Sequence, residues 1–214
     1  MGDIMIRKEL KDYIENIIFK EYEKNEEGHG INHIKYVINR SLNIYKTQEN
    51  LNEEMVYVIA AYHDIGHHID AKNHEKVSAE ILINDNNLKK FFTEEEIKIM
   101  HDAVEDHRAS NSEEPRNIYG KIVSTADRNT SVEEAIKRAY SYTKKHNPGS
   151  TEEEIYEECR RHLNQKFGKN GYAVNKIYFE DKDYLDYLEK MDEITTNKEE
   201  FDKVVDKIKW YTTY

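Results

Sequence analysis

The stretch MVYVIAAYHDIGHHID, residues 55–70, joins an apolar run directly to three histidines and two aspartates. Its first half places Met55, Ile59 and Ala60 on one face of a helix, which predicts that this helix packs in the core. Gly66 is expected to mark the carboxyl end of the helix. Ionisable side chains at such an end are costly to bury unless they share a partner. The stretch therefore indicates a functional corner where a helix leaves the core.

Apolar residues at helical spacing recur along most of the chain, and one face of the first expected helix carries Leu10, Ile14, Ile17 and Ile18. The expected helices cover residues 5–22, 31–45, 53–63, 94–107 and 117–128. Three pairs match the capping-box pattern of a helix start: Thr93 and Glu96, Ser131 and Glu134, and Thr151 and Glu154. Since the only strand pattern is a weak one in YAVNKIYF, residues 172–179, we expect an all-α helical bundle.

Length, charge and cysteine content limit the class of protein. The 214 residues suit a single all-α domain over residues 1–214, with a core over about residues 25–130 and a helical extension over about residues 131–214. A net charge of −11 argues against nucleic-acid polymers and anionic membranes as partners. The single cysteine, Cys159, fits a reducing compartment and is expected on a helix surface. No apolar run could span a bilayer, so we expect a soluble cytoplasmic protein.

The histidines are concentrated in one part of the chain, because eight of the ten lie between His29 and His107. Four ionisable groups lie three or four residues from an apolar helix stripe and are expected to point toward the core. They are His33 before Val37, His63 after Ile59, His107 after Val104, and Asp127 after Val123. Neutral imidazoles beside carboxylates can share a divalent cation. We therefore expect a metal site.

Four segments in this order resemble the HD superfamily of metal-dependent phosphohydrolases: NHIKYV (32–37), AAYHDIG (60–66), HEKVSAEI (74–81) and IVSTADR (122–128). The resemblance covers about residues 28–129 and implies an all-helical fold. It implies one metal held by His33, His63, Asp64 and Asp127, and a second, bridged by Asp64, held by His74 and His107. The cofactor it implies is one or two divalent ions among Mn, Fe, Co, Ni, Zn and Mg.

The activity implied by this resemblance is hydrolysis of a small phosphate ester or anhydride, a nucleotide above all, through a metal-activated water. Asp64 and His67 are then expected to act in catalysis. His67 stands where many relatives carry a lysine, and it could serve as general acid or phosphate contact. The residues expected to bind the phosphate are Arg108, Arg128 and Lys72.

The other histidines of this region are expected to have no such role. We expect His29 and His68 to be solvated loop residues, and His101 to pack on the side of its helix.

Two other functions stay open. A few HD relatives are oxygenases that use six similar ligands to hold two irons, and His74 and His107 allow that chemistry here. A non-catalytic module that senses a nucleotide would keep the fold, but loss of ligands would be its signature, and all four core positions are present. A homodimer also stays open.

Overall fold

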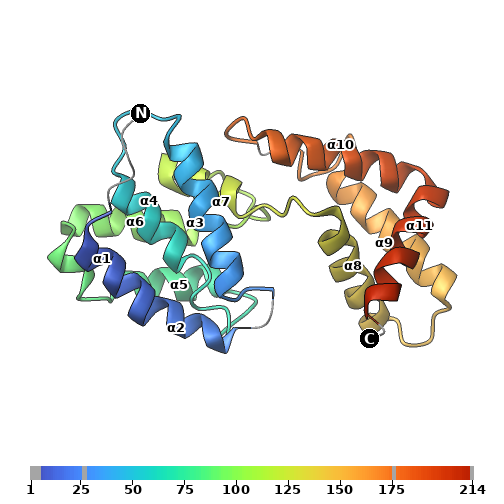
Figure 1. Ribbon diagram of the computed structural model, residues 1–214, viewed down its shortest axis with the longest axis horizontal. Helices are drawn as coiled ribbons and strands as arrows, with labels where there is room; N and C mark the ends of the chain where they lie inside the picture. The colour runs from blue at the N-terminus through green and yellow to red at the C-terminus, as the bar shows by residue number, and fades with distance from the viewer. Residues whose placement is uncertain (1–5, 26–27, 175–176, 213–214) are drawn as a thin grey trace. The chain divides into compact units, whose positions relative to one another are not determined.

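The computed structural model describes residues 6–25, 28–174 and 177–212, which form helices joined by turns and loops, with no strand (Figure 1). This confirms the expected all-α fold. In YAVNKIYF, residues 172–174 form a turn, and residues 175–176 lie outside the described residues, as does Met5 of the first expected helix. None of the described helices combines the length and the apolar character needed to cross a bilayer.

The chain divides into two compact units, Met1–Asp127 and Arg128–Tyr214, and the single-domain organisation stays a prediction. The described part of the first unit contains α1 (Lys8–Tyr13), the π-helical turn η1 (Ile14–Ile18), α2 (Phe19–Glu21), η2 (Tyr22–Lys24), α3 (Ile31–Tyr45), α4 (Glu53–Tyr62), α5 (His74–Ile83), η3 (Leu88–Lys90), α6 (Glu94–Glu105) and α7 (Ile118–Ala126). That of the second unit contains α8 (Val132–His146), α9 (Glu152–Phe167), α10 (Lys182–Thr196) and α11 (Lys198–Thr212).

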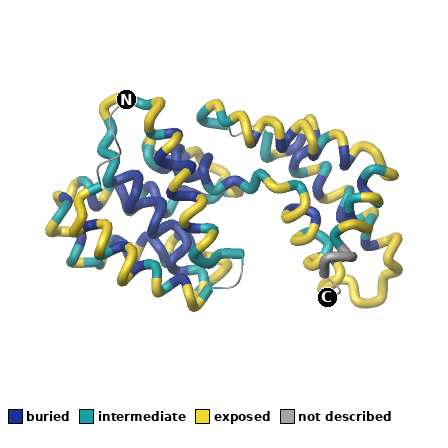
Figure 2. Tube along the Cα trace, in the orientation of Figure 1, coloured by how far each residue is buried: buried dark blue, intermediate teal, exposed yellow. Residues whose placement is uncertain are grey.

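Helix α4 forms the centre of the first unit, since every residue from Met55 to Tyr62 is buried (Figure 2). It packs against α3, α6 and α7, as expected of a helix that is apolar all round. Asn52 caps its start by accepting a hydrogen bond from the Glu54 amide at 3.0 Å. The helix ends at Tyr62, so the ionisable run that follows begins directly at the end of a fully buried element.

The first helical segment departs from the expected face. Leu10, Ile14 and Ile18 are buried, but Ile17 is 52% exposed, so its expected burial was wrong. The reason is the π-helical turn at Ile14–Ile18, which takes more residues per turn than an α-helix. Residues four apart then stay on the core face, and the residue three after Ile14 turns outward.

The second unit has its own apolar core, in which α9 contributes Ile155, Cys159 and Leu163 at a spacing of four residues. Cys159 is 1% exposed, which corrects its expected place on a helix surface: the charged residues beside it in the sequence lie on the other face. A thiol packs there as a small apolar group. Thr93 and Thr151 form both halves of their capping boxes, and Ser131 accepts the Glu134 amide, the first half of the motif.

Candidate metal centre

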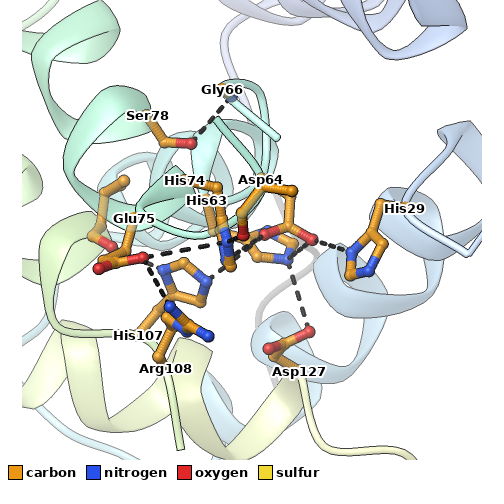
Figure 3. Close-up of polar contacts among 12 residues, drawn as sticks. His29, His63, Asp64, Gly66, His74, Glu75, Ser78, His107, Arg108 and Asp127 are labelled. Carbon is orange, nitrogen blue, oxygen red and sulfur yellow. Dashed lines mark hydrogen bonds and ion pairs between the residues drawn. The ribbon is translucent and has the colours of Figure 1, made fainter. Parts of the chain in front are cut away.

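Six ionisable side chains of the first unit meet at the ends of five helices (Figure 3). His33 lies in the first turn of α3, and His63 and Asp64 directly follow α4. His74 opens α5, His107 follows α6, and Asp127 ends α7. Helix ends can bring ionisable groups together because a side chain there reaches the edge of the core while its backbone leaves the helix.

Asp64 is the centre of this cluster, and its two oxygens face different histidines. Oδ2 lies 3.5 Å from His63 Nε2 and 3.6 Å from His33 Nε2. Oδ1 lies 3.1 Å from His74 Nε2 and 3.5 Å from His107 Nε2. One carboxylate therefore separates two pairs of imidazoles, and could bridge two ions.

Asp127 completes the group on the Oδ2 side. Its Oδ1 lies 3.1 Å from His33 Nε2 and 3.6 Å from His63 Nε2, and the two imidazole nitrogens are 3.4 Å apart. His33, His63, Asp64 and Asp127 thus face a common point, whereas His74 and His107 face the other oxygen of Asp64.

Backbone carbonyls orient three of the imidazoles. In each case Nδ1 meets the carbonyl oxygen three residues earlier: His63 with Ala60 at 2.8 Å, His74 with Ala71 at 3.1 Å, and His107 with Val104 at 2.7 Å. A carbonyl only accepts hydrogen bonds, so Nδ1 carries the proton of the neutral imidazole, and Nε2 of that form presents its lone pair to the cluster. This is the arrangement that metal-binding histidines usually have.

The charges of the cluster are balanced within it. Burial alone would raise the pKa of both carboxyl groups, but the charge of His63 and hydrogen bonds from other histidines hold the pKa of Asp64 well below its usual range. His33 and His63 likewise lower the pKa of Asp127. Burial would lower the pKa of His63, but Asp64 and Asp127 raise that pKa to about 9. The metal-free cluster therefore keeps its carboxylates ionised and offsets them with imidazole protons.

The residues fit a divalent metal. His33, His63 and Asp127 have ligand atoms within 4.8 Å of one another, as do His63, Asp64 and His107. Nε2 of His107 is buried and has no hydrogen-bond partner among the described residues. A buried nitrogen without a partner is costly unless something binds its lone pair. Imidazole and carboxylate ligands together suit Mn, Fe, Co, Ni or Zn.

A second acidic cluster, formed by His101, Asp102 and Glu105 on α6, also brings three ligand atoms within 4.8 Å. Arg116 pairs with both of its carboxylates, and Lys98 pairs with Asp102. Since these cations already neutralise its charge, this cluster is a surface ion-pair network. His101 lies on the side of α6, 2.9 Å from Asp102, which matches its expected place.

The residues expected to bind phosphate lie in different surroundings. Arg108 donates hydrogen bonds to the Lys72 carbonyl at 2.8 Å and to the Glu75 carboxylate at 3.2 Å, next to His74. Lys72 is exposed to solvent. Arg128 lies in the second unit, where it donates to the Ala173 carbonyl at 3.2 Å. Their roles toward a substrate stay predictions.

The histidine that the sequence did not point to is His29. Expected as a solvated loop residue, it instead lies with Nδ1 2.8 Å from Oδ2 of Asp64 (Figure 3). Its ring stacks on that of His67 at 3.9 Å, and the His67 ring lies 5.2 Å from that of His74. His67 therefore borders the cluster, and its catalytic role stays a prediction. His68 is exposed, as expected.

Asn25 explains why His29 reaches the cluster. Its amide nitrogen donates to the His29 carbonyl at 2.9 Å and to the Asp64 carbonyl at 3.0 Å, and its Oδ1 accepts from the His68 amide at 3.0 Å. One side chain thus fastens two loops together. Because His29 precedes α3, no helical phase marks it in the sequence, and only its position four residues before His33 could have drawn attention to it.

Gly66 has a different role from the one expected. It lies beyond the end of α4, and no described glycine has a positive φ, so it does not form a left-handed helix cap. Instead, a Cβ atom at Gly66 would lie 2.7 Å from Val77 Cγ1 and 2.9 Å from the Ser78 amide nitrogen. The Gly66 amide donates to Ser78 Oγ at 3.0 Å. Only glycine lets the turn that carries Asp64 approach α5 this closely, which brings Asp64 to His74.

Comparison with known proteins agrees with this geometry. Residues 30–131 match the family model of the HD domain, and the match includes all six side chains of the cluster. Neither the curated proteins nor the solved structures give a match to the chain. HD domains are all-α and bind divalent metals through histidine and aspartate, as the fold and the buried cluster would allow. The chain therefore contains an HD domain over residues 30–131.

Proposed function

We propose that this protein is a divalent-metal-dependent phosphohydrolase that acts on a small phosphate ester or anhydride, with a nucleotide as the first substrate to test. The observation that carries the proposal is the buried Asp64 carboxylate, whose two oxygens face two separate pairs of imidazoles. Such a carboxylate suits a bridge between two cations, an arrangement that serves phosphoryl chemistry.

The assignment of ligands follows the two sides of Asp64. His33, His63, Asp64 and Asp127 would hold one ion, and His74 and His107 would hold the other, with Asp64 shared. When bound, the ions would lower the pKa of a water molecule and stabilise negative charge on phosphoryl oxygens. Backbone carbonyls keep Nε2 of His63, His74 and His107 turned inward, so these ligands are preoriented before an ion arrives.

Other residues of the chain would handle the substrate. His67 is half-buried beside His74, and an imidazole there is suited to donate a proton to the leaving oxygen or to contact the phosphate. Arg108 uses one nitrogen for Glu75 and the Lys72 carbonyl, which leaves further guanidinium donors for a phosphate. Lys72 and Arg128 are proposed as additional contacts.

A second candidate function follows from the same ligands. Four histidines and two aspartates around a shared carboxylate would equally hold two irons, which activate oxygen in some HD oxygenases. The two functions predict different products: the hydrolase releases phosphate without oxygen, whereas the oxygenase consumes oxygen and requires iron.

The decisive experiment is elemental analysis of protein purified without chelator, followed by a screen for phosphate release from nucleotides with Mn, Co, Fe, Ni and Mg. We expect bound metal and metal-dependent phosphate release. Asp64→Ala should lose both while keeping its helical circular dichroism signal, and His146→Gln, on α8 of the second unit, should keep both. Turnover that survives in Asp64→Ala would contradict the assigned site, and oxygen uptake without phosphate release would favour the oxygenase.

A further inference from the structure

The two histidines that face Oδ1 of Asp64 are each followed by a charged residue, and these two residues form an ion pair. Glu75 follows His74 at the start of α5. Arg108 follows His107 in the loop after α6. The Arg108 guanidinium donates to Oε2 of Glu75 at 3.2 Å (Figure 3). The pair therefore joins the segment that carries one ligand of the proposed second ion to the segment that carries the other.

One guanidinium nitrogen of Arg108 holds the chain on both sides of His74. It donates to the Lys72 carbonyl at 2.8 Å, before the imidazole in the sequence, and to the Glu75 carboxylate directly after it. Oε2 of Glu75 itself lies 3.9 Å from Nδ1 of His74. Arg108 thus fixes the turn that carries His74 from outside α5.

Burial distinguishes this pair from an exposed one. The side chain of Glu75 is 10% exposed and that of Arg108 is 33% exposed. In the Lys98–Asp102 pair on α6, by contrast, the side chain of Lys98 is 56% exposed. Exposed pairs contribute little to stability, whereas a buried carboxylate that loses its cation is costly. Loss of either partner of the buried pair should therefore displace the chain around it, which includes the segments that carry the two imidazoles.

The spacing of these imidazoles is set partly outside the helices. α6 ends at Glu105, so His107 lies in the loop beyond it. The rings of His74 and His107 have their centres 5.3 Å apart, and Nε2 of each faces Oδ1 of Asp64. A bond between zinc and an imidazole nitrogen is about 2.0–2.1 Å long. Both imidazoles can bind one ion only if their spacing stays within a narrow range.

We propose that the Glu75–Arg108 pair positions His74 and His107 for the second ion, and so decides whether the centre binds two ions or one. This inference rests on the two-ion arrangement of the proposed function. It makes Glu75 a positioning residue and gives Arg108 a role besides contact with phosphate. Replacement of a residue that orients metal ligands typically weakens metal binding about 10–100-fold. Because the pair flanks His74 and His107, the loss should be confined to the second ion.

The test is titration of the full metal-free chain with Mn²⁺, followed by calorimetry and by electron paramagnetic resonance. The wild type should bind two ions and give the signal of an exchange-coupled pair at saturation. In Arg108→Gln and in Glu75→Ala the first ion should bind as in the wild type and the second about tenfold or more weakly. The double variant should lose no more than either single variant, because both changes break the same contact. Lys98→Gln, which breaks the exposed pair on α6, is the matched control and should bind both ions.

Three results would each overturn the inference: a wild type that binds one ion, an unchanged second ion in both single variants, or an equal weakening of both ions. Additive losses in the double variant would also overturn it, because the two residues would then act separately. Arg108 lies in a loop and is partly exposed, so Arg108→Gln should fold even if Glu75→Ala does not, as circular dichroism with chelator would show. The titration contains no substrate, so its outcome is separate from phosphate release, which tests the proposed hydrolase activity.

Discussion

Replacing His107 by leucine tests the metal centre through stability rather than through turnover. His107 is 1% exposed, its Nε2 has no hydrogen-bond partner among the described residues, and its Nδ1 donates to the Val104 carbonyl at 2.7 Å. Leucine is apolar and similar in size. The variant therefore removes a buried nitrogen without a partner and one hydrogen bond, and leaves the packing nearly filled.

The expected effect of His107→Leu on the free energy of unfolding differs between the metal-free and the metal-bound protein. Without metal, removal of the unpartnered nitrogen gains about 1–3 kcal/mol and loss of the hydrogen bond costs about 0.5–1.5 kcal/mol. The Val104 carbonyl still accepts the Asp106 amide. His107 also helps to lower the pKa of Asp64, so its loss offsets part of this gain, and the metal-free variant should be about as stable as the wild type. At a metal concentration of 100 times Kd the wild type gains about 2.7 kcal/mol, whereas a variant that binds about 100-fold more weakly gains about 0.4 kcal/mol.

The assay is urea unfolding followed by circular dichroism, with chelator and with Mn²⁺, on the wild type, His107→Leu and the control His146→Gln. We expect metal to stabilise the wild type and the control by about 2 kcal/mol more than His107→Leu. Equal stabilisation of all three proteins would refute the assignment of His107 as a ligand. A metal-free variant destabilised by several kcal/mol would instead show that the imidazole has a structural role.

Three further predictions concern the surroundings of Asp64. Gly66→Ala should lower the free energy of unfolding by about 1–3 kcal/mol in urea unfolding, because its Cβ would overlap α5; Gly149→Ala, with nothing within 4 Å, should not. His29→Ala should weaken metal binding about 10–100-fold in competition with a chromogenic chelator, whereas His68→Ala should change it less, since the His68 amide keeps its bond to Asn25. In the folded protein the pKa of His63 is raised to about 9. Protonation of His63 therefore stabilises the metal-free protein fully below about pH 6.5, and this stabilisation decreases progressively as the pH rises toward 9. A metal ion binds the neutral imidazole, so the stabilisation by Mn²⁺ in urea unfolding should increase between about pH 6.5 and 8.5. A decrease over this range would contradict the assignment of His63 as a metal ligand.

The sequence predicts those members of the cluster that continue the apolar face of a helix. His63, His107 and Asp127 each follow an apolar residue by three or four positions, and in a regular helix this spacing places a side chain on the core side. The structure brings all three together with His33, as expected. The bounds of α3 and α4 also lie within one residue of the expected ones, because both helices carry a long apolar face between polar turns.

What could not be predicted depends on contacts between segments far apart in the chain. His29 reaches Asp64 because the Asn25 carboxamide joins two loops, and neither loop has a periodic pattern. The need for Gly66 arises from the approach of α5, not from its own backbone angles. Ile17 turned outward because a π-helical turn changed the local period. In all three cases the deciding interaction is outside the window that a sequence pattern describes.

The geometry of the cluster also couples metal binding to the folded state. The six side chains come from five helix ends spread from α3 to α7, so they share a centre only when these helices are packed on one another. In the unfolded chain the same residues are far apart, and an ion that binds all of them must favour the folded form. Without an ion, the carboxylates of Asp64 and Asp127 depend on imidazole protons, and Nε2 of His107 has no hydrogen-bond partner in the part of the chain that the structure describes. The residues that would give this protein its activity are therefore ones that limit its stability until the metal is bound.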